Sequence, residues 1–183
     1  MKHLFTNLIG AMLCLFVAQT AQAQLILTAV YDGPLSGGTP KGIELYATED
    51  IADLSIYGIE SANNGGGANG EEYVFPNVAV DEGDFIYVAK GVTQFEDYFG
   101  FAPDYGPTSA VDVNGDDVVI LYKNGIIHDI FGELGVDGSG TPWEYPDGWV
   151  YRKDNTGPDG TSFNARSEEH TSELQSPCNL VCR

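Results

Sequence analysis

The sequence predicts an all-β protein, either a sandwich or a barrel of short strands. Between residues 24 and 165 the apolar residues come in short bursts rich in Val, Ile, Tyr and Phe. Clusters of Gly, Pro, Asn and Asp separate the bursts at intervals of about 8–12 residues, a spacing typical of all-β folds. Helical periodicity is almost absent from this stretch, and no segment repeats at a fixed period, which argues against a solenoid or a propeller.

Each burst marks one expected strand. In chain order the predicted strands cover residues 25–31, 42–47, 54–59, 71–75, 85–89, 118–122, 126–131 and 149–152. Residues 92–99 (VTQFEDYF) are the exception, because they fit a short helix with Thr93 as its cap and with Phe95, Tyr98 and Phe99 on one side. One helix among strands leaves the fold class unchanged.

The clearest local pattern is a β-hairpin. The runs VVILY and IIHDIF flank Asn124-Gly125, and Asn-Gly tolerates the positive φ angles of a type I′ turn. The first run, 118–122, is apolar on both faces, so we expect it at the centre of a sheet that is covered on each side.

The two ends of the chain differ from the β-rich part. Residues 1–23 open with Lys2 and His3, continue through an apolar stretch and close on Ala21-Gln22-Ala23, the pattern of a signal peptide cleaved near Ala23. We therefore expect a secreted or cell-surface protein. The apolar stretch is shorter than the roughly 20 residues of a spanning helix, so no membrane span is expected in the mature form.

The sequence of the C-terminal segment 166–183 differs in composition from the Gly-, Asp- and aromatic-rich chain before it. Residues 166–176 (RSEEHTSELQS) match, residue for residue, the translation of a common short-read sequencing adapter. We interpret 166–183 as a non-native tail, and we expect the natural gene to continue beyond Ala165. Cys14, Cys178 and Cys182 all fall outside residues 24–165, so no disulfide framework is expected in the domain.

Charge excludes one class of function. The chain has 8 Lys and Arg against 27 Asp and Glu, a formal net charge of -19. A protein that binds nucleic acid by neutralising phosphates needs the opposite sign, so direct nucleic-acid binding is not expected.

One acidic loop has the residue spacing of a cation site. Asp112, Asn114 and Asp116 place oxygen-bearing side chains at alternate positions, as calcium-binding loops do. The Gly expected at the sixth position is Asp117, however, and the acid expected at the twelfth is Lys123. We favour an Asx/Gly turn that leads into the next strand, with calcium as the alternative and no other cofactor expected.

The Gly-rich run 61–70 (SANNGGGANG) is not expected to bind phosphate. It lacks the Lys of a phosphate-binding loop, and Glu71 and Glu72 follow it, where their charge would repel phosphate. A flexible loop between two strands is expected.

An aromatic segment near the C-terminus allows two interpretations. Trp143, Tyr145 and Trp149 lie close together in sequence between turn residues. They could form an exposed platform for a sugar ring or a peptide, or they could pack in the interior. Packing is favoured, because large aromatic side chains are usually substantially buried.

Catalytic motifs are lacking between residues 24 and 165. His128 is the only histidine there, and neither a G-x-S-x-G motif nor a cysteine nucleophile occurs. We expect His128 to be a half-buried or surface strand residue. Acidic residues are so abundant that no single pair of them indicates a glycosidase.

Taken together, the stretch from Leu25 to about Phe163 resembles bacterial lamin-tail domains. The matching residues are LILTAVYDGPLSGG, KGIELY, DLSIYG, GDFIYVA, NGDD leading into VVILYKNG, and DIFG followed by WEYPDGWVYRK. The resemblance implies an immunoglobulin-like β-sandwich. It also implies a final strand after the Gly/Pro loop at 156–160, and residues 166–183 interrupt the sequence there. We therefore expect a sandwich that lacks its final strand and has an exposed edge.

The resemblance further implies a non-catalytic domain of a secreted or surface protein. We expect an accessory binding or interaction domain whose partner is a protein or a polysaccharide. Two alternatives stay open at this point: the N-terminal accessory portion of a truncated extracellular nuclease, and a carbohydrate-binding module that uses Trp143, Tyr145 and Trp149.

Overall fold

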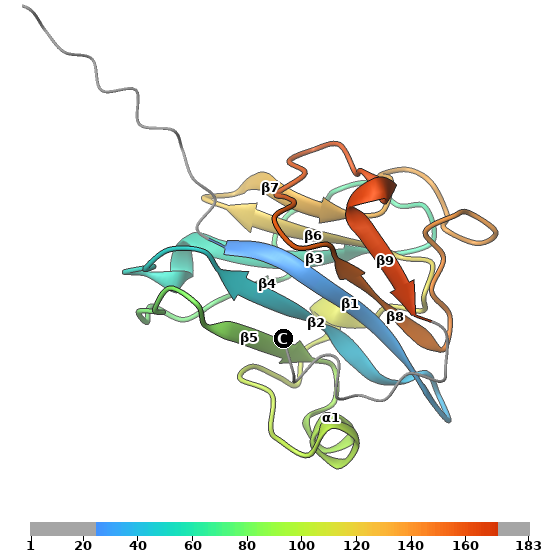
Figure 1. Cartoon of the computed structure of the whole chain (residues 1–183), viewed down its shortest axis with the longest axis horizontal. Helices are drawn as coiled ribbons and strands as arrows, with labels where there is room; N and C mark the ends of the chain where they lie inside the picture. The colour runs from blue at the N-terminus through green and yellow to red at the C-terminus, as the bar shows by residue number, and fades with distance from the viewer. Residues whose placement is uncertain (1–24, 172–183) are drawn as a thin grey trace, which may run out of the picture.

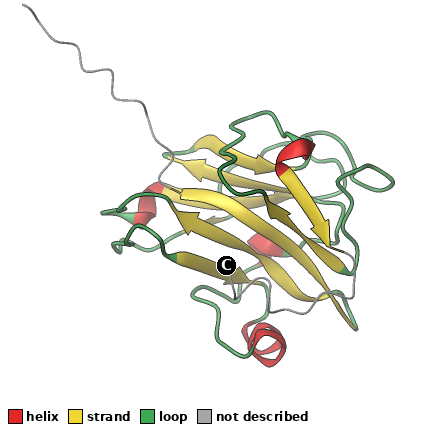
Figure 2. Cartoon of the chain, in the orientation of Figure 1, coloured by secondary structure: helices red, strands yellow, loops and turns green. Residues whose placement is uncertain are grey.

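The computed structural model describes residues 25–171 as a sandwich of two antiparallel sheets (Figures 1 and 2). The five-stranded sheet has the order β5-β2-β1-β8-β9, and the four-stranded sheet has the order β4-β3-β6-β7. This confirms the predicted all-β sandwich. The predicted signal peptide, the three cysteines and residues 172–183 lie outside the described residues.

The strands follow the predicted bursts closely. Their bounds are β1 Leu25–Leu35, β2 Thr39–Ala47, β3 Tyr57–Ala62, β4 Tyr73–Val74, β5 Phe85–Ala89, β6 Val118–Lys123, β7 Ile126–Phe131, β8 Gly148–Arg152 and β9 Glu168–Thr171. Short 3-10 turns occupy Leu54–Ile56, Ser109–Val111 and Ala165–Ser167. The predicted strand 54–59 therefore divides into a 3-10 turn and the start of β3.

The β6–β7 hairpin forms as predicted. Asn124 and Gly125 have φ angles of 53° and 72°, which are the positive values a type I′ turn requires. β6 pairs with β3 on one side and with β7 on the other, so it is central in its sheet. Its residues from Val118 to Tyr122 are all buried, which explains why this strand is apolar on both faces.

The main core lies between the two sheets, and a second apolar cluster lies on the outer face of the five-stranded sheet. The outer cluster comprises Ala29, Tyr31, Ala89, Phe95, Trp149 and Tyr151. Phe95 belongs to α1 (Val92–Phe99), which packs against this face beside β5 (Figure 1). Tyr98 and Phe99 pack on the same cluster, as the sequence predicts.

The cap of α1 differs from the expectation. Gly91 is the N-cap residue, and Thr93 lies inside the helix. The helix ends at Gly100, whose φ of 83° gives the left-handed C-cap that glycine adopts without steric cost. None of the helices between residues 25 and 171 is long and apolar enough to cross a membrane.

The expectation of an open edge beside β8 is wrong. Residues of the segment that we interpret as a non-native tail supply β9, which pairs antiparallel with β8 from Arg152↔Glu168 to Trp149↔Thr171. Main-chain hydrogen bonds between strands need no particular side chains, so an unpaired strand edge can pair with a segment that carries no apolar alternation.

Candidate functional site

The loop predicted as a turn or a calcium site folds around a lysine ammonium. Lys41 Nζ donates to Asp32 Oδ1 at 2.8 Å, to Asn114 Oδ1 at 2.9 Å and to the carbonyl oxygen of Val113. The side chains of Lys41 and Asp32 are only 7% and 8% exposed. A protein cation therefore occupies the centre of this loop and satisfies its oxygens.

The other two calcium candidates point to different partners. Asp112 pairs with Lys90 at 2.5 Å, and Asp116 Oδ2 accepts from Ser139 Oγ at 2.8 Å. Among residues 25–171 no group of three or more His, Cys, Asp or Glu side chains is arranged to hold a metal ion. The structure therefore does not bring Asp112, Asn114 and Asp116 together as ligands, and the turn interpretation fits the geometry.

The aromatic candidates are buried and separated. Trp143 and Tyr145 belong to the core cluster, where Phe131 contacts both rings at centroid distances of 6.0 and 5.2 Å. Trp149 belongs to the outer cluster beneath α1. These three residues are each at most 4% exposed, so they pack in the interior and do not form an exposed platform in this structure.

The Gly-rich loop connects β3 to β4, and buried carboxylates anchor it. Glu60 accepts from the backbone N–H groups of Asn69 and Gly70, and the Tyr122 hydroxyl donates to the same carboxylate. Asp117 holds the other end by accepting from the Asn64 N–H at 2.8 Å. The loop therefore does bind an anionic group with its backbone amides, but that group is a side chain of this protein.

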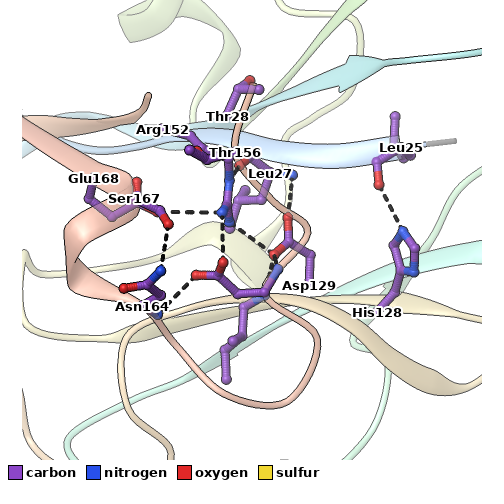
Figure 3. A network of polar contacts seen from close by, with 12 residues as sticks. Leu25, Leu27, Thr28, His128, Asp129, Arg152, Thr156, Asn164, Ser167 and Glu168 are labelled. Atoms are coloured by element: carbon purple, nitrogen blue, oxygen red, sulfur yellow. Dashed lines mark hydrogen bonds and ion pairs between the residues drawn. The ribbon is translucent and has the colours of Figure 1, made fainter. Parts of the chain in front are cut away.

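A buried arginine joins the two sheets at a β-bulge (Figure 3). The register of β1 against β2 shifts at Thr28, and the backbone of Leu27 next to it is satisfied by side chains. Arg152 Nε donates to the Leu27 carbonyl at 2.7 Å, and the Leu27 N–H donates to Asp129 Oδ2 at 2.9 Å. The bulge thus frees two backbone groups of β1, and β7 and β8 supply their partners.

The same guanidinium lies among three carboxylates. Arg152 pairs with Asp129 at 2.9 Å, with Asp159 at 3.2 Å and with Glu168 at 3.6 Å. Glu168 makes the longest of these contacts, and burial raises its pKa to about 7. One guanidinium is therefore the shared counter-charge of three buried acids, and it stabilises the ionised form of Glu168 least.

His128 occupies a half-buried position on β7, as the sequence predicts. Its Nε2 lies 3.0 Å from the Leu25 carbonyl oxygen (Figure 3). Its ring meets the Tyr57 ring edge-on, with 5.8 Å between the centroids. Burial lowers the pKa of His128 below its usual value. These contacts tie β7 to the start of β1, which is a structural role.

A groove on the outer face of the five-stranded sheet is the best candidate for a binding site. Its volume is about 900 Å³, a size typical of ligand sites. Strand residues line its floor, and the loop after β8 forms its wall. The lining residues are Ile26, Thr28, Tyr46, Thr48, Gly83, Phe85 and residues 152–157. We call this feature the outer groove.

Strand register builds the floor of the outer groove. Ile26 pairs with Tyr46 across β1 and β2, and Tyr46 pairs with Phe85 across β2 and β5. The rings of Tyr46 and Phe85 lie 4.8 Å apart between centroids, and both side chains are partly exposed. Sequence reasoning missed this pair, because alternation along each strand cannot show which strands become neighbours.

No family model, curated protein or solved structure matches this chain.

Proposed function

We propose that this chain is a non-catalytic binding domain of a secreted or surface protein, and that the outer groove binds a neutral oligosaccharide. The observation that supports the proposal is the aromatic floor of the groove, where Tyr46 and Phe85 lie side by side and partly exposed. Aromatic faces pack well against the apolar faces of sugar rings, while polar groups around them orient the hydroxyls.

The wall of the groove supplies those polar groups. Thr48 and the loop residues Asn155 and Thr156 line it. Asn155 has a φ of 60°, so the loop turns sharply at this position. Hydroxyl and amide groups around an aromatic floor suit a ligand that is rich in hydroxyls and carries no charge.

Charge argues against an anionic ligand. The molecule carries a net charge of -19, and the two basic residues that line the groove are engaged elsewhere. The Arg152 side chain is 2% exposed and surrounded by carboxylates, and Lys153 Nζ donates to the Arg166 carbonyl at 2.7 Å. A phosphate, a sulfated glycan or a nucleic acid would meet repulsion without a free counter-charge.

Isothermal titration with neutral hexasaccharides tests the proposal. Cellohexaose, maltohexaose and chitohexaose serve as probes, and at least one of them should bind the wild-type chain. Tyr46→Ala and Phe85→Ala should each weaken that binding at least tenfold, because each removes half of the stacking surface.

The matched control is Val74→Ala on β4, which is 50% exposed and belongs to the other sheet. This variant should bind as the wild type does. Amide chemical shifts recorded during the titration should move in β1, β2, β5 and the 152–157 loop. The proposal fails if all three sugars leave these shifts unmoved, or if a bound sugar is unaffected by both aromatic substitutions.

A further inference from the structure

We infer that Lys41 and Asn114 form an intramolecular amide bond, with Asp32 as the group that carries the proton. The bond would join Lys41 Nζ to Asn114 Cγ and release the carboxamide nitrogen as ammonia. It would link β2 of the five-stranded sheet to the loop that leads into β6 of the four-stranded sheet.

The lysine already contacts the carboxamide that it would attack. Lys41 Nζ donates to Asn114 Oδ1, the oxygen bonded to Cγ, at 2.9 Å, and these residues are 73 positions apart in the chain. The backbone holds Asn114 in place, because its N–H donates to Asp117 Oδ2 at 2.9 Å. Groups fixed at contact distance react as if they were present at a very high concentration, which is how a weak electrophile such as a carboxamide becomes competent.

Asp32 is positioned to move the proton. Its Oδ1 accepts from Lys41 Nζ at 2.8 Å, and burial raises the pKa of Asp32 above its ordinary value. A carboxylate in such a site accepts a proton from the ammonium more readily than it would in water. The transfer leaves Lys41 as a neutral amine, which is the form that attacks a carbonyl carbon.

The bond changes balance without any other reactant. Asp32 takes a proton from the Lys41 ammonium, and the amine lone pair forms a bond to Asn114 Cγ. The Cγ–Nδ2 bond then breaks, and the departing nitrogen takes up protons from the new amide nitrogen and from Asp32. The products are a secondary amide and an ammonium ion. No electrons are exchanged with any other group, and Asp32 returns to its carboxylate form.

The surroundings enclose the nucleophile and leave an exit for ammonia. A Cβ added at Gly38 would lie 2.4 Å from Asp32 Oδ1 and 3.0 Å from Lys41 Nζ, so this backbone closes directly over the pair. Tyr145 is buried near Asp32 and Asp117, and its hydroxyl finds no hydrogen-bond partner within residues 25–171. Asn114, by contrast, is exposed at the protein surface, so ammonia can leave into solvent.

Mass spectrometry of the purified full chain tests the bond. The intact mass should fall short of the sequence mass by one molecule of ammonia. Trypsin does not cleave after an acylated lysine, so the digest of the unfolded protein should lack cleavage at Lys41. A branched species should appear in which the peptide ending at Lys90 is joined to residues 91–123.

Lys90 is the internal control, because it contacts a carboxylate and not a carboxamide. Cleavage after Lys90 should be complete. Lys41→Arg and Asn114→Ala should restore the full sequence mass, Lys90→Arg should still lose ammonia, and Asp32→Asn should abolish or greatly slow the loss. Circular dichroism on each variant establishes that it folds.

Two results overturn the inference. One is the full sequence mass with normal cleavage at Lys41 in a folded wild-type chain. The other is normal cleavage at Lys41 together with loss of ammonia, or with its later replacement by water, because the backbone nitrogen of Gly115 can instead attack Asn114 Cγ, release ammonia and give a succinimide that then hydrolyses. If the Asp32→Asn variant still formed the bond between Lys41 and Asn114 at the wild-type rate, Asp32 would not be the proton carrier.

Discussion

Arg152 illustrates how one side chain can hold several elements in place. It bonds to the carbonyl that the β1 bulge frees, and its guanidinium lies among Asp129, Asp159 and Glu168. Buried ion pairs add little net stability compared with apolar packing, but removing one partner leaves the others charged in a low-dielectric site.

Arg152→Met should therefore destabilise the fold by about 3–5 kcal/mol, because the buried acids that surround it lose their counter-charge. Methionine retains an apolar stem of similar length, which isolates the loss of charge. Urea unfolding at neutral pH measures the difference. Lys90→Met is the control, since the Lys90 side chain is 44% exposed in its pair with Asp112 and should cost about 0–1 kcal/mol. Equal midpoints for the two variants would contradict this account.

His128 should make the protein less stable in mild acid. Burial lowers its pKa in the folded state, so the unfolded chain binds the proton more tightly. The contribution of neutral His128 to the free energy of unfolding is fully present above its ordinary pKa of 6.5. This contribution is lost as the pH falls toward the lowered pKa of the folded state. The free energy of unfolding, measured from about pH 7.5 to about pH 5, should fall more steeply for the wild type than for His128→Gln. Parallel profiles would show that His128 titrates as it does in the unfolded chain.

At the scale of elements, β9 covers the edge of β8 although its sequence does not indicate a strand. Its sequence, EEHT, has no apolar burst and would not be identified as a strand from its pattern. It pairs because β8 presents unpaired backbone groups and because Glu168 reaches Arg152. The position of Glu168 should make this docking depend on pH.

Glu168 has a folded-state pKa of about 7, above the ordinary 4.5, so the folded state binds its proton more tightly. β9 should therefore dock most firmly below about pH 4.5, and this contribution should be lost as the pH rises through about 7. The positive charges of Arg152 and Lys153 lower the pKa of Glu168, whereas the negative charges of Asp159 and Asp129 raise it.

Hydrogen exchange of the β8 and β9 amides at about pH 6 and about pH 8, corrected for intrinsic rates, measures this docking. Protection should be lower at the higher pH in the wild type and nearly constant in Glu168→Gln. The β6–β7 amides provide the control, because that pair belongs to the other sheet. Equal protection of the wild-type β8 and β9 amides at the two pH values would refute the prediction.

At the scale of the whole molecule, the two sheets and the outer cluster share their strands. β1 faces the main core with Leu25, Leu27 and Val30, and it contributes Ala29 and Tyr31 to the outer cluster. The Leu27 N–H of β1 donates to Asp129 of β7, in the other sheet. Lys41 of β2 donates to the Val113 carbonyl in the loop that leads into β6. Such shared elements favour a single cooperative transition.

The two tryptophans allow a test of this cooperativity, because Trp143 reports on the main core and Trp149 on the outer cluster. The variants Trp143→Phe and Trp149→Phe each leave one reporter. In each variant, the urea transition followed by tryptophan fluorescence should coincide with the transition followed by far-ultraviolet circular dichroism. If the outer cluster melted first, the Trp143→Phe variant would show an earlier fluorescence transition.

Local patterns in the sequence determined most of the elements. Asn124-Gly125 between two apolar runs predicted the β6–β7 hairpin, and the spacing of Phe95, Tyr98 and Phe99 predicted α1 and its buried face. These predictions succeed because turn chemistry and side-chain periodicity act over a few residues. The all-β class follows from the same local information, summed along the chain.

Only the tertiary structure decided which side chains meet. The ammonium group of Lys41, on β2, reaches the loop that we considered for calcium, although Lys41 is 73 positions from Asn114. Tyr46 meets Phe85 only because β2 pairs with β5. Burial of Trp143, Tyr145 and Trp149 likewise depends on which faces the two sheets and α1 cover. Strand order and sheet packing are non-local, and a pattern read along one strand does not contain them.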